Sequence, residues 1–166
     1  MTRKFLTTMA ASAGLSIAAM TLAGTPALAV IDNSPAAVNT NEAGIALHGF
    51  DPVAYFTVGQ PTRGSASFTA FHEGATYRFA SAANRDRFKA NPAAYAPQFG
   101  GFCAMGVALE KKLDGDPNVW KIVDGKLYLN VNPDVAVAWN RDIPGNIAKA
   151  NENWPEIRHA TPQSLG

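Results

Sequence analysis

Clustered apolar residues predict a hairpin in the first half of the chain. Segments 68–71 and 76–79 are rich in aromatic residues and lie on either side of Glu73-Gly74. This arrangement is typical of two strands joined by a turn. Tyr77 and Phe79 stand two residues apart, so they should share one face of the second strand.

A second hairpin and a short strand complete the expected sheet. Segments 119–123 and 126–131 flank Asp124-Gly125, a dipeptide that suits the type I′ turn of a tight hairpin. Upstream, the apolar run 53–56 follows the turn signal Asp51-Pro52. We expect this run to form a short buried strand.

Helices are expected between and after the hairpins. Their predicted ranges are 82–89, 133–140 and 144–153. Ser81 is a good N-cap for the first, and Asn132 followed by Pro133 begins the second. Trp154-Pro155 should end the third. The fold class is therefore α+β, with a small antiparallel sheet built from hairpins and three or so short helices.

The first 29 residues have the pattern of a cleavable signal peptide. Arg3 and Lys4 precede the apolar stretch 5–22, and the small-residue site 27–29 follows. Cleavage is expected before Val30, which predicts a periplasmic or secreted protein. The alternative is a retained membrane anchor, but a spanning helix needs about 20 strongly apolar residues, and this stretch is interrupted by polar ones.

Residues 30–166 have the length and composition of one domain with a flexible segment at each end. Residues 30–43 are interpreted as a flexible leader, 44–155 as one domain and 156–166 as a flexible tail. Removing two of the 14 basic residues with the signal peptide leaves 12 against 13 acidic ones, a net charge of −1. No basic stripe for nucleic acid is present, and no membrane span is expected after cleavage.

The single cysteine, Cys103, is the first candidate for chemistry. One interpretation is a buried, inert core thiol. Another is a soft metal ligand, with Cys103 and Met105 offering two sulfurs to copper(I). A third is a reactive thiol. The sequence alone leaves all three open.

His48, His72 and Asp51 are the other candidate metal ligands. Either histidine could complete a Cys-His site, and the alternative for each is an exposed or hydrogen-bonded loop residue. Asp51 is a candidate ligand or general base, and it is also placed to cap its own turn. Asp114 and Asp116 lack the further oxygen ligands of a calcium loop, so we interpret them as a solvated turn. No nucleophile motif is present, and an enzyme is not expected.

Five ordered motifs together resemble the YHS-domain family in its exported bacterial form. They are Gly49-Phe50-Asp51-Pro52-Val53-Ala54-Tyr55-Phe56, Tyr77-Arg78-Phe79-Ala80-Ser81, Phe88-x-x-x-Pro92-x-x-Tyr95, Gly100-Gly101-Phe102-Cys103-Ala104 and Gly125-Lys126-Leu127-Tyr128-Leu129. The resemblance runs from about Ala43 to Trp154. It implies a compact α+β unit related to treble-clef metal-binding modules, whose short members are thought to bind metal through cysteines.

Three positions depart from the metal-binding form of that family. Where the resemblance implies cysteine, this chain has Ala54, Ala80 and Asn84. A cysteine-rich tetrahedral site cannot form from them, so any metal site would be a new one anchored on Cys103. The sequence thus predicts an exported binding module, with copper(I) or zinc as the candidate cofactor. The alternatives are metal-free thiol redox or small-ligand binding, or an interaction domain for a protein partner of unknown identity.

Overall fold

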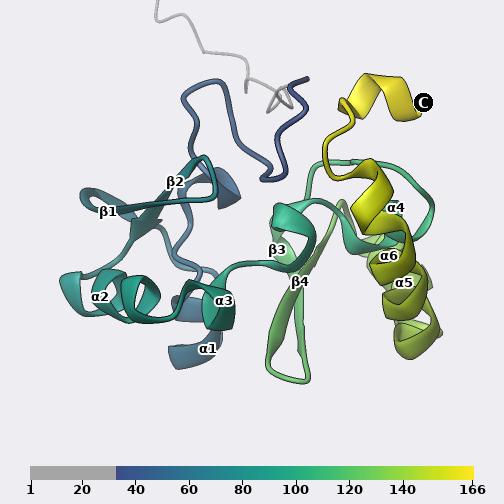
Figure 1. The fold of residues 1–166 in the computed structure, drawn as a ribbon. Helices are drawn as coiled ribbons and strands as arrows, with labels where there is room; N and C mark the ends of the chain where they lie inside the picture. Colours follow the sequence, from purple (N-terminus) through teal and green to yellow (C-terminus); the bar gives the residue numbers. More distant parts are fainter. Residues whose placement is uncertain (1–32) are drawn as a thin grey trace, which may run out of the picture.

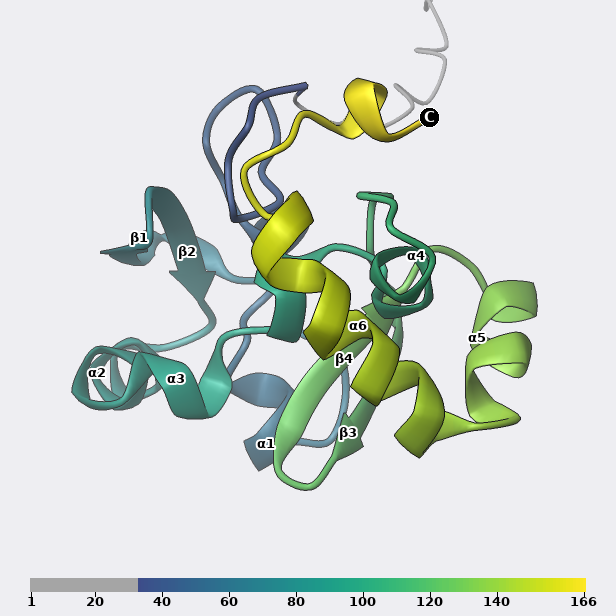
Figure 2. The same ribbon diagram turned by 45° about the vertical axis from the view of Figure 1, so that its right-hand side comes forward.

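The computed structural model describes residues 33–166; the predicted signal peptide lies outside them. Hairpin β1–β2 with helices α1 to α3 forms one side of the molecule, and helices α4 to α6 form the other, with hairpin β3–β4 between them (Figure 1). Helix α6 runs along the outside of the second side (Figure 2). The fold is α+β, with two antiparallel hairpins and six α-helices. Three of these helices have eight or more residues, as the sequence predicts.

The elements follow one another in a simple order. The strands are β1 (Ser65–His72), β2 (Ala75–Phe79), β3 (Asp116–Val123) and β4 (Lys126–Asn130). The α-helices are α1 (Ala54–Thr57), α2 (Ala82–Ala90), α3 (Pro92–Tyr95), α4 (Ala104–Ala108), α5 (Pro133–Asn140) and α6 (Ile143–Ile157). Three short 3₁₀ helices are η1 (Leu47–Gly49), η2 (Gln98–Gly101) and η3 (Pro162–Leu165).

Both predicted hairpins are present. In β2, Tyr77 and Phe79 are buried on one face, as their spacing of two predicts. The turn between β3 and β4 places Asp124 and Gly125 at φ of 49° and 71°, and the type I′ turn requires positive φ at both of its central residues. The Asp-Gly signal is therefore confirmed.

The hairpins form two separate sheets rather than the single expected one. One edge of each hairpin is bridged to a loop segment instead. Ile45 pairs with Thr76 on β2, and Cys103 pairs with Leu129 on β4. At these positions the loop segments take the edges of β2 and β4, so these two strands do not pair with each other there.

The short strand predicted over 53–56 is wrong, because this segment is helix α1. The backbone N–H of Val53 donates to Asp51 Oδ1 over 2.8 Å, and the N–H of Ala54 donates to the same oxygen. These two bonds form an Asx turn that leads into the helix. A four-residue apolar run fits a strand or a buried helical turn equally well, so periodicity could not decide.

The predicted caps hold, but one predicted helix end does not. Ser81 accepts from the N–H of Asn84, and Asn132 accepts from the N–H of Val135. Helix α6 continues past the stop predicted at Pro155 and ends at Ile157. The ring removes one donor from the helix, yet the exposed backbone around it can be hydrated, and the Arg158 N–H still bonds to Trp154 O.

Three buried clusters make up the core. One lies under hairpin β1–β2 and helix α2 and includes Tyr77, Phe79 and Phe88. A second joins α4, α5, α6 and η2 and includes Trp139. The third lies between them, where Leu127 of β4 packs among residues from α1 and η1. The central hairpin therefore links the two sides of the molecule.

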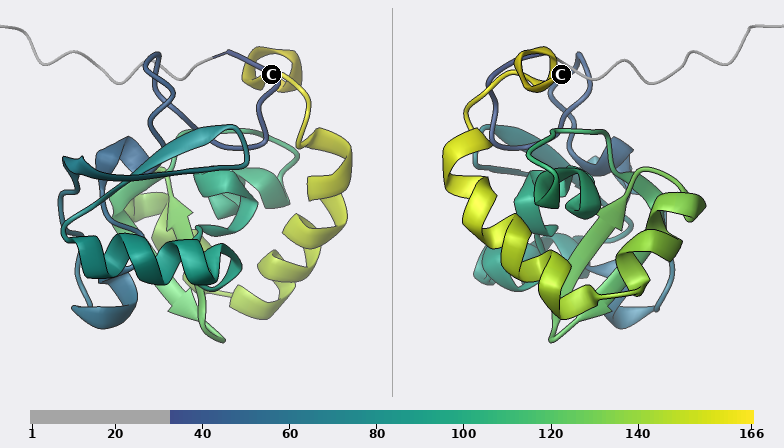
Figure 3. Two further views of the ribbon diagram at one scale, coloured as in Figure 1. Left: turned by 60° about the vertical axis from the view of Figure 1, so that its left-hand side comes forward. Right: turned by 90° about the vertical axis from the view of Figure 1, so that its right-hand side faces the viewer.

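The ends of the described chain lie side by side (Figure 3). Asn33 and Gln163 exchange two hydrogen bonds. The ammonium of Lys112, only 1% exposed, donates to the backbone oxygens of Ala36, Arg158 and Ala160. One buried lysine thus ties part of the predicted leader and part of the predicted tail to the domain.

Candidate functional site

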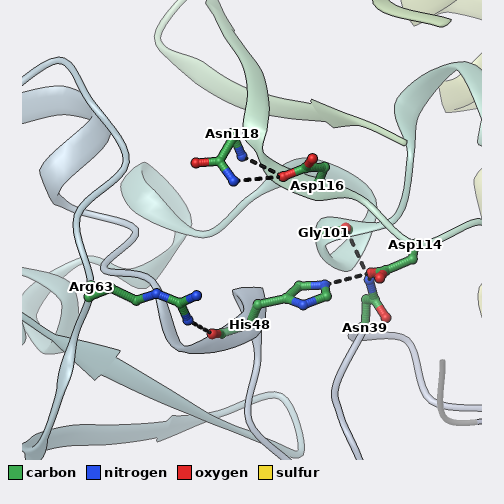
Figure 4. Close-up of polar contacts among 7 residues, drawn as sticks. All are labelled: Asn39, His48, Arg63, Gly101, Asp114, Asp116 and Asn118. Atoms are coloured by element: carbon green, nitrogen blue, oxygen red, sulfur yellow. Dashed lines mark hydrogen bonds and ion pairs between the residues drawn. The ribbon is translucent and has the colours of Figure 1, made fainter. Parts of the chain in front are cut away.

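A pocket of about 320 Å³ opens between η1 and the start of β3. Its lining comes from four separate segments of the chain: His48, Phe50, Arg63, Asp114, Asp116, Pro117, Asn118 and Val131. Five of these eight side chains are polar or charged, and the close-up in Figure 4 shows these five. A pocket of this size can hold a small ligand.

His48 and Asp114 form an ion pair at the edge of this pocket. The Nε2–H of His48 donates to Asp114 Oδ1 over 2.8 Å (Figure 4). The side chains are 28% and 23% exposed. The hydrogen bond to Asp114 raises the pKa of His48, and burial only partly opposes it; the charges of Asp114 and Asp116 raise it further. These contacts therefore favour the protonated, charged form of His48.

A hydrogen bond from Asn39 and the local backbone conformation hold the His48–Asp114 pair in place. Asn39, a buried residue, donates to Asp114 Oδ1 over 2.6 Å and to Gly101 O over 3.4 Å. The backbone of Leu47 and His48 is left-handed, with φ of 51° and 50°. Two consecutive non-glycine residues in this region are strained, and such strain clusters at functional sites.

Arg63 supplies the positive charge of the pocket. Its Nη1 donates to the backbone oxygen of His48 over 2.9 Å, and its guanidinium carbon lies 4.1 Å from the centroid of the Phe50 ring. This cation–π contact and the hydrogen bond hold the guanidinium in one orientation. The remaining N–H donors of Arg63 have no partner within residues 33–166.

Asp116 supplies a second carboxylate. Its Oδ1 accepts from the backbone N–H of Asn118 over 2.8 Å and from the side-chain amide of Asn118 over 3.0 Å (Figure 4). The two ion pairs formed by the described residues include neither Arg63 nor Asp116. The pocket therefore holds one arginine and one carboxylate that are oriented but not neutralised by ion pairing.

Cys103 lies elsewhere, in the core. It is fully buried, and its Sγ accepts from the N–H of Gly106 over 3.3 Å at the start of α4. The thiol donates to Asn130 Oδ1 over 3.6 Å. Burial raises the pKa of this thiol, although neighbouring backbone N–H groups oppose the shift. This environment favours a neutral packed thiol over a thiolate.

The other candidate ligands are dispersed. The His72 ring packs edge-on against Phe88, with the centroids 5.7 Å apart. Met105 packs against the core cluster around α4. In residues 33–166, no group of three or more histidine, cysteine or acidic side chains is arranged to hold a metal ion. The structure does not gather Cys103, His48 and His72 into such a group.

Asp51 is the centre of a buried hydrogen-bond network. It is fully buried; Oδ1 accepts from the backbone N–H of Val53 and Ala54, as its capping role predicts. Oδ2 accepts from the N–H of Ala80 over 2.8 Å and from Nδ2 of Asn84 over 2.7 Å. Four donors satisfy this carboxylate, which makes it a structural link between α1 and α2.

The sequence predicts only part of the pocket. His48 is a predicted candidate, whereas the pattern around Asp114 and Asp116 predicts a solvated turn, and no motif marks Arg63. Gly115 between the two acids carries a usable signal. A Cβ at Gly115 would overlap Gly101 O, so this glycine permits the close approach that brings Asp114 to His48.

Comparisons of the chain with protein-family models, with curated proteins and with solved structures find no match. The resemblance to the YHS-domain family therefore stays a prediction from the motifs. The part of the chain that the structure describes contains no helix long and apolar enough to cross a membrane.

Proposed function

We propose that this protein is an exported binding protein, with a domain of the YHS type, that binds a small zwitterionic molecule in the pocket beside His48. The observation that carries the proposal is the pocket itself, in which Arg63 and Asp116 are oriented by other contacts and yet unpaired. Export rests on the signal-peptide pattern of residues 1–29.

The charges of the pocket favour a ligand with both signs. His48 and Asp114 pair with each other over 2.8 Å. Arg63 is then available for a carboxylate, which its planar fork can bind with two hydrogen bonds. Asp116 is available for an ammonium group. A ligand with only one of these groups would leave an opposite charge partly desolvated and unpaired, which costs affinity.

The pocket favours binding over covalent catalysis. Its eight lining residues, all in the described part of the chain, include no hydroxyl, thiol or amine nucleophile. A histidine–carboxylate pair needs such a nucleophile to act as a catalytic triad. His48 instead has Nδ1 free of hydrogen bonds to residues 33–166, so it can hydrogen-bond to the bound molecule.

Titration with glycine, acetate and methylamine tests this proposal. Glycine is the smallest carboxylate–ammonium molecule, and the other two represent its halves. NMR shifts of the backbone N–H groups of His48 and Asn118 report occupancy. We expect glycine to bind at least about tenfold more tightly than either half, because two charge-assisted contacts form together.

Two variants and one matched control complete the test. Arg63→Gln should remove the preference for glycine over methylamine, and Asp116→Asn should remove its preference over acetate. Arg141→Gln, an exposed arginine at the end of α5, should bind like the unaltered protein. Equal affinity for all three probes, or no effect of either pocket variant, contradicts the proposal.

A metal-binding function at Cys103 is the second candidate, carried by the sequence prediction. Copper(I) or zinc would have to open the N-terminal turn of α4 to reach Sγ. Anaerobic titration of the purified protein beside Cys103→Ser decides it. One-to-one binding that is lost in the variant supports a metal site, and equal affinity of both proteins contradicts it.

A further inference from the structure

A second pocket, of about 490 Å³, lies on the side of the molecule where α6 approaches hairpin β1–β2. The turn between β1 and β2 lines one wall, and the C-terminal end of α6 lines another. The segment from α3 to η2 forms a third wall. None of its lining residues belongs to the pocket beside His48.

Arg158 gives this pocket a cation that the fold leaves unused. Its Nε is buried and has no hydrogen-bond partner. A buried donor without an acceptor is rare and destabilising, unless a ligand supplies the acceptor. Among the described residues the only other such atom is Nε1 of Trp139, a core residue of α5 that lines neither pocket.

The remaining wall residues define what could pair with Arg158. Phe99 and Trp154 contribute aromatic surface, with their ring centroids 5.8 Å apart. Lys126 adds a second positive charge, and Glu73 is the one acidic residue in the lining. The pocket thus combines two cations, flat apolar walls and one opposing carboxylate.

We propose that this pocket binds a small organic anion with a carboxylate on a flat apolar body. The carboxylate pairs with the guanidinium of Arg158 and supplies the acceptor that Nε lacks. The apolar body lies against Phe99 and Trp154, where burial of its surface adds affinity. This site is independent of the zwitterion site, because the two share no residue.

Benzoate is the test probe, with benzamide, acetate and inorganic phosphate as comparisons. Benzamide keeps the shape without the charge, acetate keeps the carboxylate without the ring, and phosphate tests a general anion site. The indole N–H signal of Trp154 in NMR spectra of the purified protein reports binding. We expect benzoate to bind at least about tenfold more tightly than each of the other three.

Variants distinguish this site from the first one. Arg158→Gln should weaken benzoate binding about tenfold or more, and Arg158→Lys should recover part of it, because the charge stays but the planar fork is lost. Glu73→Gln should strengthen binding about two- to fivefold by removing an exposed repulsive charge. Arg63→Gln should leave benzoate binding unchanged.

Equal binding of benzoate and benzamide overturns the proposal, and so does unchanged affinity in Arg158→Gln. Stronger binding of phosphate than of benzoate overturns it as well, because a simple anion would then be preferred. If Arg158→Gln does not fold, the conclusion rests on Arg158→Lys and Glu73→Gln, and unchanged affinity in both overturns it.

Discussion

Replacing Asp51 by alanine should be among the most destabilising single substitutions in this protein. The carboxylate is fully buried and accepts from four N–H groups, from Val53, Ala54, Ala80 and Asn84. Each buried donor left without an acceptor costs about 1–3 kcal/mol. Relaxation and entry of water into the space reduce the sum, so we expect a loss of about 3–5 kcal/mol in the free energy of unfolding.

Asp51→Asn is the sharper variant because it keeps the shape of the side chain. Whichever way the new amide is turned, its NH₂ group faces at least one backbone N–H donor: those of Val53 and Ala54, or that of Ala80. We therefore expect a loss of about 2–4 kcal/mol. Asn84→Ala removes a single donor from the network and should cost only about 1 kcal/mol.

Urea unfolding of the purified proteins measures these changes. A loss of 4 kcal/mol, at about 2 kcal/mol per molar of urea, lowers the midpoint by about 2 M. Asp134→Ala is the matched control, because Asp134 is exposed in the first turn of α5 and should change stability by less than about 1 kcal/mol. A loss below about 1 kcal/mol for Asp51→Ala would refute the reasoning.

Three further predictions follow from individual contacts. Asp114 raises the pKa of His48, so the protonated His48 stabilises the fold fully below about pH 6.5 and this contribution is lost as the pH rises through the folded-state pKa. Asp114→Asn should lower the pKa of His48 measured by NMR, and an unchanged pKa contradicts the pairing. Gly100→Ala should destabilise by about 1–3 kcal/mol in urea unfolding, because Gly100 has φ of 62° and its new Cβ would overlap Ala37 O; unaltered stability contradicts this. Alkylation of Cys103, which is buried with a raised thiol pKa, should be slow until urea unfolds the protein, and equal rates in both states contradict it.

Local sequence signals predicted the elements whose ends are set by neighbouring residues. Asn132 with Pro133 fixed the start of α5, and Asp124-Gly125 fixed the turn of the second hairpin. In both cases the determining hydrogen bond or backbone dihedral lies within three residues. The helix end predicted at Pro155 is wrong, because this proline lies on the exposed side of α6 and the helix continues past it.

The candidate site could not be predicted in the same way, because its geometry is long-range. His48 and Asp114 are 66 residues apart in the chain, and Arg63 comes from a third segment. Each residue type alone is common in loops. Their meeting depends on how η1 and the start of β3 pack against each other, which no local pattern encodes.

The hydrogen bonds around Asp51 lie where the resemblance to the YHS-domain family implies a metal site. On the resemblance to the YHS-domain family, metal-binding members have cysteines at the positions of Ala54, Ala80 and Asn84. In this structure all three residues donate to one carboxylate, that of Asp51. The segments that cysteines would link through a metal are here linked by hydrogen bonds, so this part of the fold can be stable without one.

Asp51 and His48 have separate roles, one in holding the fold and one in the proposed binding site. A buried carboxylate with four donors has no free lone pairs to offer a ligand, so Asp51 is committed to holding α1 against α2. The ligand site that we propose begins three residues upstream, at His48, whose strained backbone presents the side chain to Asp114 at the pocket edge. A loss of stability in Asp51→Asn together with unchanged glycine binding below the unfolding transition would establish that the two roles are separate.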